Sequence, residues 1–275
     1  MLKVGYQGVP GSYSEMGVIQ YFGNNTRNIP YDNFREMIAD VERNSIDFAL
    51  LPIENSTTGA ITRSLDLMKD YNVYIVGEEF VNVGHCLITF EGVSFDEIKT
   101  IYSHPEALKQ CDDFFDKHKQ INKVAYLDTA KSVEYIIQLG DRTAGALASK
   151  RAAQIYDMNL LAENIQDNKL NITRFAVISN EDSYENDADT VSLYIVTSHT
   201  SGSLYQCIRV ISENNINMLK IESRPIHEKP FSYGFYIDFE GNTISDNTLK
   251  VLSELKNHCE YIRIIGNYKK KLAIY

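Results

Sequence analysis

Asn171-Ile172-Thr173-Arg174-Phe175-Ala176-Val177-Ile178 begins with polar side chains and then runs into an apolar segment. Such an apolar run is typical of a buried strand, so the polar side chains at its start need hydrogen-bonding partners. If they face a cleft, the carboxamide, hydroxyl and guanidinium form a binding site for a small anion. If they do not, they mark only the entrance to a strand. The other polar segments of the chain have to decide between the two.

Short apolar runs alternate with amphipathic helical patterns from residue 1 to about residue 180. This alternation predicts an α/β domain whose largely parallel sheets are covered by helices. The predicted strands are 3–6, 48–51, 73–76, 86–90, 100–103, 124–126, 145–148 and 174–178. The predicted helices are 13–22, 34–43, 61–70, 105–117, 130–138 and 150–156. Asn33 and Pro105 are typical of helix starts.

The pattern changes after a polar, acidic stretch at residues 181–189, which we interpret as a linker. Beyond it the order is strand 190–197, helix 202–213, strands 218–226 and 233–239, helix 248–258 and strand 261–268. This βαββαβ order is the ferredoxin-like unit. We therefore predict a second domain at 190–275.

Composition restricts the classes of partner. The net charge is −10, which argues against a nucleic-acid groove or an anionic membrane as the main partner. No apolar run is long enough to span a bilayer, and no signal peptide is visible, so we expect a cytoplasmic protein. The four cysteines have no CxxC spacing, so we expect reduced thiols and no metal site.

Three polar segments of the first domain lie where predicted strands end or begin. Residues 5–15 link a strand to a helix, but their glycine spacing does not match a dinucleotide fingerprint. Residues 51–60 carry five consecutive polar side chains, with Arg63 one turn into the next helix. The third segment is the opening stretch. Each of them, taken alone, could equally be a cap or a turn, but open α/β sheets bind ligands at such strand ends. Together they favour a site for a small anion.

No Ser/His/Asp triad or pair of acid and base carboxylates can be assembled. His85, His104 and His118 lie near no evident nucleophile, and a lone histidine is more often structural than catalytic. In the second domain, residues 201–204 open a helix and residues 221–225 end a strand. Either they are ordinary turns, or they form a ligand site at a domain or subunit interface.

Five segments in this order and spacing resemble prephenate dehydratase over essentially the whole chain. They are residues 6–15 (YQGVPGSYSE), 51–56 (LPIENS), 103–111 (SHPEALKQC), 171–175 (NITRF) and 221–225 (IESRP). The C-terminal part resembles the phenylalanine-binding ACT domain of that family.

The resemblance implies a catalytic domain at 1–180 with two lobes like those of type II periplasmic binding proteins. Lobe one would comprise about 1–76 and 158–180, and lobe two about 77–157. The implied reaction is the decarboxylative dehydration of prephenate to phenylpyruvate in phenylalanine biosynthesis, without metal or organic cofactor. The implied assembly is a homodimer or homotetramer that phenylalanine inhibits through the ACT domain.

The resemblance also implies roles for individual residues. Thr173 matches the threonine that is essential in the family, and we expect it to hydrogen-bond the leaving hydroxyl, either as proton donor or as orienting group. The other expected catalytic residues are Asn55, Ser56 and Gln110. Substrate contacts are expected from Ser12, Tyr13, Ser14, Thr57, Arg63, Ser103, Asn171, Arg174 and Phe175. Effector contacts are expected from Gly202, Ser203, Leu204, Glu222, Ser223 and Arg224, although the family usually has alanine at the position of Ser203.

Two other functions remain open. Arogenate dehydratase performs the same chemistry on the aminated substrate, and residues 6–15 resemble that group equally well. A non-catalytic amino-acid-sensing protein would also combine binding-protein lobes with an ACT domain, but the presence of Thr173 argues against an inactive enzyme.

Overall fold

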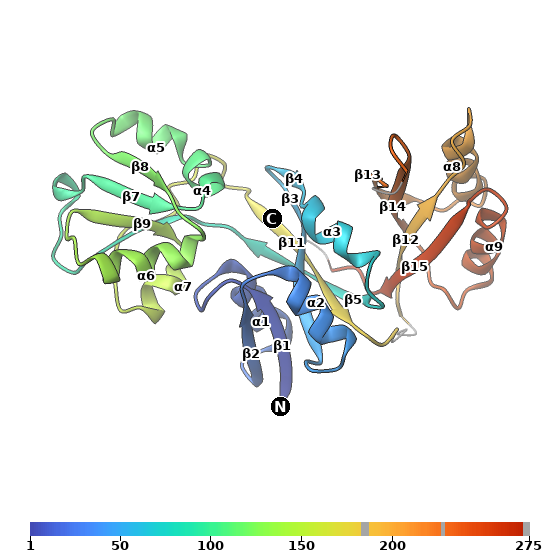
Figure 1. The fold of residues 1–275 in the computed structure, drawn as a ribbon, viewed down its shortest axis with the longest axis horizontal. Helices are drawn as coiled ribbons and strands as arrows, with labels where there is room; N and C mark the ends of the chain where they lie inside the picture. Colours follow the sequence, from blue (N-terminus) through green and yellow to red (C-terminus); the bar gives the residue numbers. More distant parts are fainter. Residues whose placement is uncertain (183–186, 227–228, 272–275) are drawn as a thin grey trace.

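Three packed units make up the computed structural model, which describes residues 1–182, 187–226 and 229–271. Figure 1 shows them in a row, with the N-terminal lobe between the second lobe and the C-terminal unit. No helix within these described ranges is long and apolar enough to cross a membrane.

The N-terminal lobe is built on a mixed sheet with the order β5-β11-β3-β1-β2. One apolar cluster packs α1 on one face, and another packs α2 and α3 on the opposite face. Its elements are β1 (Leu2–Gln7), α1 (Tyr13–Phe22), β2 (Thr26–Tyr31), α2 (Phe34–Glu42), β3 (Phe48–Asn55), β4 (Gly59–Ala60), α3 (Thr62–Met68), β5 (Tyr74–Asn82) and β11 (Ile172–Ser179). β11 runs antiparallel to both β3 and β5, so it is an inner strand of this sheet.

The second lobe has its own five-stranded sheet with the order β10-β6-β9-β7-β8. Its elements are β6 (Cys86–Thr89), the 3-10 helix η1 (Phe95–Glu97), β7 (Thr100–Ser103), α4 (Pro105–Lys109), α5 (Asp112–Lys117), β8 (Asn122–Ala125), α6 (Thr129–Leu139), β9 (Ala144–Ala148), α7 (Lys150–Ile155) and β10 (Asn159–Ala162). The mixed α/β class predicted from the sequence is confirmed in both lobes.

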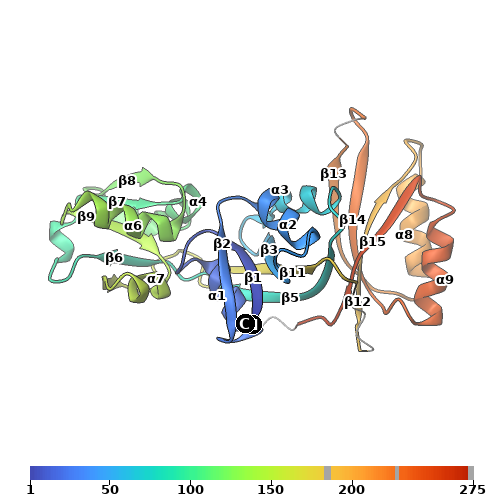
Figure 2. The same ribbon diagram turned by 60° about the horizontal axis from the view of Figure 1, so that its bottom comes forward.

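The C-terminal unit follows the predicted βαββαβ order. Its elements are β12 (Thr190–Val196), α8 (Ser203–Glu213), β13 (Met218–Pro225), β14 (Tyr233–Glu240), α9 (Asp246–Leu255) and β15 (Tyr261–Tyr268). Figure 2 shows α8 and α9 on the face of this sheet that is turned away from the N-terminal lobe. The opposite face contributes Tyr194, Tyr236 and Tyr268 to the apolar cluster around α2 and α3, so the two units share a core.

One parallel backbone pairing, Gly266 with Ile75, joins β15 to β5. It makes a single ten-stranded sheet out of the N-terminal lobe and the C-terminal unit. The approach is close, because a Cβ atom at Gly266 would lie 2.7 Å from the carbonyl oxygen of Ile75. Glycine at this position therefore permits the contact.

Helix starts were predicted well because the capping chemistry is local. Asn33 Oδ1 accepts a hydrogen bond from the Glu36 backbone N–H at 2.9 Å at the start of α2. His104 caps α4, and Pro105 occupies its first turn. The single helix predicted at 105–117 is wrong, since the chain breaks at Gln110 and Cys111 into α4 and α5.

The predicted lobe boundaries also need correction. β5 does not end at residue 76 but pairs with β11 as far as Asn82, and β10 belongs to the second lobe because it pairs with β6. Glu78 and Glu79 are acidic, so the sequence did not predict that this part of the chain is a buried strand. Both residues are 2% exposed, and their carboxylates pair with Arg174 and Lys271. The strands β2, β4 and β10 were not predicted. The predicted linker 181–189 includes residues 183–186, which lie outside the described residues.

Candidate active site

The polar ends of β3 and β11 meet where Thr173 pairs with Asn55. The two side chains are nearly buried, at 8% and 7% exposed. Asn55 Nδ2 donates to Thr173 Oγ1 at 3.0 Å and to Asn171 Oδ1 at 2.8 Å. Two side chains of the stretch 171–178 therefore share one partner on the neighbouring strand.

The orientation of the Asn55 carboxamide follows from the loop after it. The backbone N–H groups of Thr57 and Thr58 contact Asn55 Oδ1 at 2.9 and 3.0 Å, and such groups only donate. The other end of the carboxamide is therefore the NH₂ group, and Thr173 Oγ1 accepts its hydrogen bond. The proton of the Thr173 hydroxyl remains available for donation to a bound molecule.

The same reasoning extends the chain of hydrogen bonds to Gln110. Since Asn171 Oδ1 is an acceptor, its Nδ2 must donate to Gln110 Oε1, at 2.8 Å. His85 Nε2 lies 2.9 Å from the same oxygen and so carries a proton. Both contacts use the carbonyl end of Gln110, which leaves its NH₂ group available for a ligand.

His85 completes a connection between the lobes. Its Nδ1 lies 3.1 Å from the hydroxyl of Tyr13, the first residue of α1, and that hydroxyl donates to the carbonyl of Gly84 at 2.8 Å. Burial lowers the pKa of His85 and raises that of Tyr13, so both are neutral near pH 7. His85 is not among the residues that the sequence predicts for the site. Its position directly before β6, where the chain enters the second lobe, was the available signal.

A second contact between the lobes surrounds Gly11. Its carbonyl accepts a hydrogen bond from Ser149 Oγ at 2.5 Å, and its N–H donates to Glu15 Oε2 at 2.8 Å. Glu15 also pairs with Arg151 of α7 at 2.9 Å. Gly11 has a φ of +87°, and a Cβ there would lie 2.7 Å from Ala152 Cα, so only glycine fits without strain.

Two cavities lie beside these contacts. One, of about 540 Å³, is lined by Thr57, Asn171 and Gln110 together with residues of α4 and the segment 166–168. The other, of about 750 Å³, is lined by Arg63 together with Gln7, His104 and Asp128 from strand and helix ends of both lobes. The predicted residues Thr57 and Arg63 thus line different cavities.

Three predicted hydroxyls form hydrogen bonds within the scaffold, and the fourth, that of Ser14, lies in a buried position. Ser12 Oγ caps α1 by accepting from the Glu15 N–H, and Ser14 is buried within the same helix. Ser103 Oγ is fully buried and donates to the Leu147 carbonyl at 2.7 Å. Ser56 Oγ joins β3 to β11, since it donates to the Leu170 carbonyl and accepts from the Ile172 N–H.

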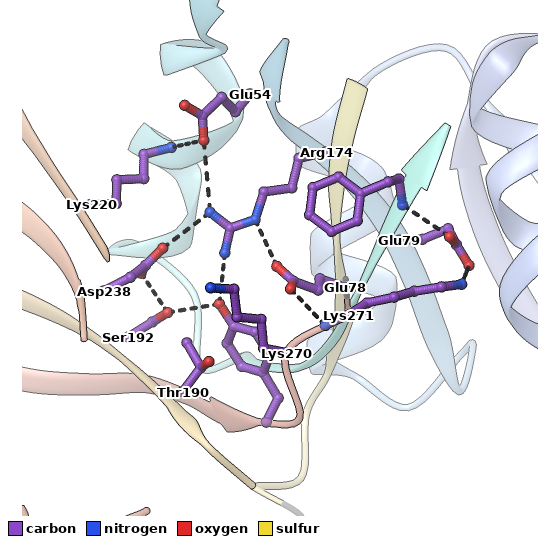
Figure 3. Close-up of polar contacts among 12 residues, drawn as sticks. Glu54, Glu78, Glu79, Arg174, Thr190, Ser192, Lys220, Asp238, Lys270 and Lys271 are labelled. Carbon is purple, nitrogen blue, oxygen red and sulfur yellow. Dashed lines mark hydrogen bonds and ion pairs between the residues drawn. The ribbon is translucent and has the colours of Figure 1, made fainter. Parts of the chain in front are cut away.

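Arg174 and Phe175 were also predicted to contact substrate, and the structure places both elsewhere. Side chains alternate along a strand, so Arg174 points to the face opposite Thr173. There it pairs with Glu78 at 2.7 Å and Asp238 at 3.2 Å (Figure 3). Phe175 is 2% exposed in the apolar cluster that packs α1.

The predicted effector residues divide between the two faces of the C-terminal sheet. Gly202, Ser203 and Leu204 line two cavities of about 340 Å³ each at the start of α8. Ser223 pairs with Phe235, which lines one of them.

Arg224 faces the N-terminal lobe, where it forms two hydrogen bonds of 2.7 and 2.6 Å with Asp66. Glu222 lies on the same face by alternation. The guanidinium of Arg224 thus has a carboxylate partner in this structure, and its assignment to the effector stays a prediction.

The family model of prephenate dehydratase matches residues 4–183. A chloroplastic arogenate dehydratase/prephenate dehydratase of Arabidopsis thaliana is 35% identical over 288 residues, covering 99% of this chain and 73% of that protein. A bifunctional chorismate mutase/prephenate dehydratase of Aquifex aeolicus is 33% identical, covering 98% of this chain and 74% of that protein.

Solved structures resemble the whole chain. Prephenate dehydratase from Arthrobacter aurescens in complex with L-Phe has a TM-score of 0.90 at 25% identity, covering 99% of this chain and 92% of that one. GqqA, described as a quorum quenching acylase, has a TM-score of 0.89 at 27% identity, with 98% of each chain covered.

Proposed function

The chain belongs to the prephenate dehydratase family, and from this membership we propose that it converts prephenate to phenylpyruvate in phenylalanine biosynthesis. The observation that carries the proposal is the directed chain of hydrogen bonds from the Thr57 and Thr58 amides to Thr173 and Gln110. It leaves a hydroxyl proton and an NH₂ group for a substrate rich in oxygen.

The reaction suits such a site. Prephenate dianion and one proton give phenylpyruvate, carbon dioxide and water. The electrons of the C–CO₂⁻ bond move into the ring, which becomes aromatic as the C–OH bond breaks. The driving force is therefore already in the substrate, and the protein has to orient it and assist departure of the hydroxyl.

We assign Thr173 to the departing hydroxyl. Its oxygen is held by Asn55, so its proton is offered to the substrate, and the hydrogen bond strengthens as charge develops on the leaving oxygen. Gln110 and Asn171, which line the same cavity from opposite lobes, orient the substrate there, whereas Arg63 lines the other cavity and has no part in this assignment. No nucleophile is required.

We propose that residues 190–275 form the regulatory ACT domain and that phenylalanine is the inhibitor. The related Arthrobacter aurescens enzyme is described in complex with L-Phe. The candidate contacts are Gly202, Ser203, Leu204 and Ser223, and a homodimer or homotetramer is the proposed assembly. A cytoplasmic location agrees with the free thiols of all four cysteines.

Arogenate is the second candidate substrate, since the Arabidopsis thaliana relative carries both names. It differs from prephenate by an amino group in place of the keto oxygen. Turnover of both compounds, each measured with and without phenylalanine, separates the two. A strong preference for arogenate would replace our first choice.

The decisive experiment is a pair of substitutions at Thr173. Thr173→Val keeps the shape and removes the hydroxyl, so we expect kcat to fall on the order of 100-fold or more. Thr173→Ser keeps the hydroxyl and should retain most of the activity. A well-folded valine variant with near-normal kcat would remove Thr173 from the mechanism.

A further inference from the structure

Two neighbouring rungs of the β3–β11 ladder point to opposite faces of the sheet. We call the pair Thr173–Asn55 the catalytic rung and the pair Arg174–Glu54 behind it the interdomain rung. Because side chains alternate along each strand, the second rung faces the C-terminal unit and the first lies on the opposite face, where Asn55 bonds Asn171. The backbone cannot shift one rung without moving the other.

Both members of the interdomain rung are ion-paired to the C-terminal unit. Arg174 Nη1 lies 3.2 Å from Asp238 Oδ2 of β14, and Arg174 Nη2 lies 3.1 Å from the Tyr268 hydroxyl of β15. Glu54 Oε2 accepts from Lys220 Nζ of β13 at 3.0 Å and lies 3.7 Å from Arg174 Nη1. Three strands of the C-terminal unit thus hold the two strands that carry the catalytic rung.

Most side chains of these contacts are shielded from water. Those of Arg174, Asp238 and Lys220 are only 15%, 10% and 12% exposed, whereas that of Glu54 is 39% exposed. Burial alone would lower the pKa of Arg174, but Tyr268, Asp238 and Glu78 outweigh it and raise that pKa. The Arg174–Asp238 pair is therefore little screened by salt, and the Glu54–Lys220 pair is screened more.

Asp238 is in turn fixed within its own domain. Ser192 Oγ donates to Asp238 Oδ1 at 2.6 Å and lies 3.2 Å from the Tyr268 hydroxyl (Figure 3). A displacement of β12, β14 or β15 therefore changes the position of the carboxylate that Arg174 contacts.

We propose that Asp238 and Lys220 are positioning residues for the dehydration, because they hold the interdomain rung and thereby the catalytic rung in place. An effector bound to the C-terminal unit would reach Thr173 and Asn55 through the same two ion pairs. This inference rests on the proposed function, since it concerns the same site and its regulation.

The test compares Asp238→Asn with Tyr236→Phe in the full-length protein. Both residues lie on β14 and bond the N-terminal lobe, but Tyr236 donates its hydrogen bond to the Leu65 carbonyl of α3, away from both rungs. The side chain of Asp238→Asn has the same size but no charge. We expect it to lower kcat about tenfold with KM changed by less than about twofold, and to weaken inhibition by phenylalanine.

Tyr236→Phe should keep the kcat and the phenylalanine inhibition of the wild type. Lys220→Met removes the partner of Glu54 on β3 instead of the partner of Arg174 on β11. It should also lower kcat and weaken inhibition by phenylalanine, as Asp238→Asn does. Assays are run well below the unfolding midpoint of each variant, so that the comparison concerns folded protein.

Two results would overturn the inference: unchanged kcat and inhibition in both Asp238→Asn and Lys220→Met, or an equal loss in Tyr236→Phe, which would indicate general loosening of the interface. Failure of the proposed function looks different, because the wild-type protein itself would then not turn over prephenate.

Discussion

Replacing Asn55 by aspartate exchanges an NH₂ group for an oxygen and hardly changes the size of the side chain. The oxygen that accepts from the Thr57 and Thr58 amides keeps both hydrogen bonds. The new oxygen faces two acceptors, Asn171 Oδ1 and Thr173 Oγ1, at the former 2.8 and 3.0 Å. The Thr173 hydroxyl is expected to rotate, donate to the carboxylate and no longer offer its proton to the substrate.

The substitution is expected to have a small effect on the free energy of unfolding and a large effect on kcat. Asn171 relieves its own conflict by turning its carboxamide, and that turn passes to Gln110, whose carbonyl then replaces its NH₂ group at the cavity. The NH₂ group of Gln110 then faces His85 Nε2, so the proton of His85 has to move to Nδ1. Two weakened hydrogen bonds lower the free energy of unfolding by about 2 kcal/mol. Loss of the proton-donating group lowers kcat by on the order of 10²- to 10⁴-fold, or roughly 3–5 kcal/mol.

The assay is phenylpyruvate formation from prephenate, with unfolding followed by denaturant. Asn267→Asp is the matched control, because Asn267 is 2% exposed, accepts from the Thr243 N–H at 3.0 Å and donates to the Thr190 carbonyl at 3.0 Å. It should lose similar stability and keep its activity. A folded Asn55→Asp protein with kcat within about threefold of the wild type would refute the directed chain.

Gly11→Ala should destabilise the protein by about 1–3 kcal/mol and raise KM, because its Cβ meets Ala152 between the lobes; Gly140→Ala, with φ +66° and nothing within 4 Å, is the control for backbone strain alone. An equal effect at both glycines would argue against the steric explanation. Because burial lowers the pKa of His85, the unfolded chain binds a proton below pH of about 6.5 that the folded chain does not. The free energy of unfolding of the protein should therefore fall by up to about 1.4 kcal/mol per pH unit as pH decreases towards the lowered pKa of His85. His85→Gln should lack this contribution, and equal pH slopes in both proteins would contradict it.

Local chemistry explains what could be predicted from the sequence. The helix starts at Asn33 and Pro105 depend on neighbours within three residues, and the βαββαβ order follows from periodicity. Thr173 was assigned because five segments of the chain, in their order and spacing, resemble the family.

The errors concern side chains whose partners are distant in sequence. Arg174 was assigned to the substrate because its partner Asp238 lies 64 residues away, in the other domain. The middle of β5 was not predicted because it contains Glu78, and a carboxylate is rarely buried in a strand without a partner. That partner is Arg174, which lies far away in the sequence. His85 connects the lobes through its contacts with Tyr13 and Gln110, and the sequence alone does not place these residues near each other.

The pairing of Gly266 with Ile75 also has consequences for truncation of the protein and for replacement of its C-terminal unit. β5 lies between β11 and β15 in the sheet, so removal of residues 190–275 leaves one of its edges without a neighbour. The same cut opens the apolar cluster that Leu65 and Met68 share with Tyr194, Tyr236 and Tyr268 of the C-terminal unit. An uncovered edge beside apolar surface is a template for self-association. The isolated N-terminal part is therefore an aggregation-prone fragment, and any replacement for the C-terminal unit has to supply a strand with a glycine at this contact.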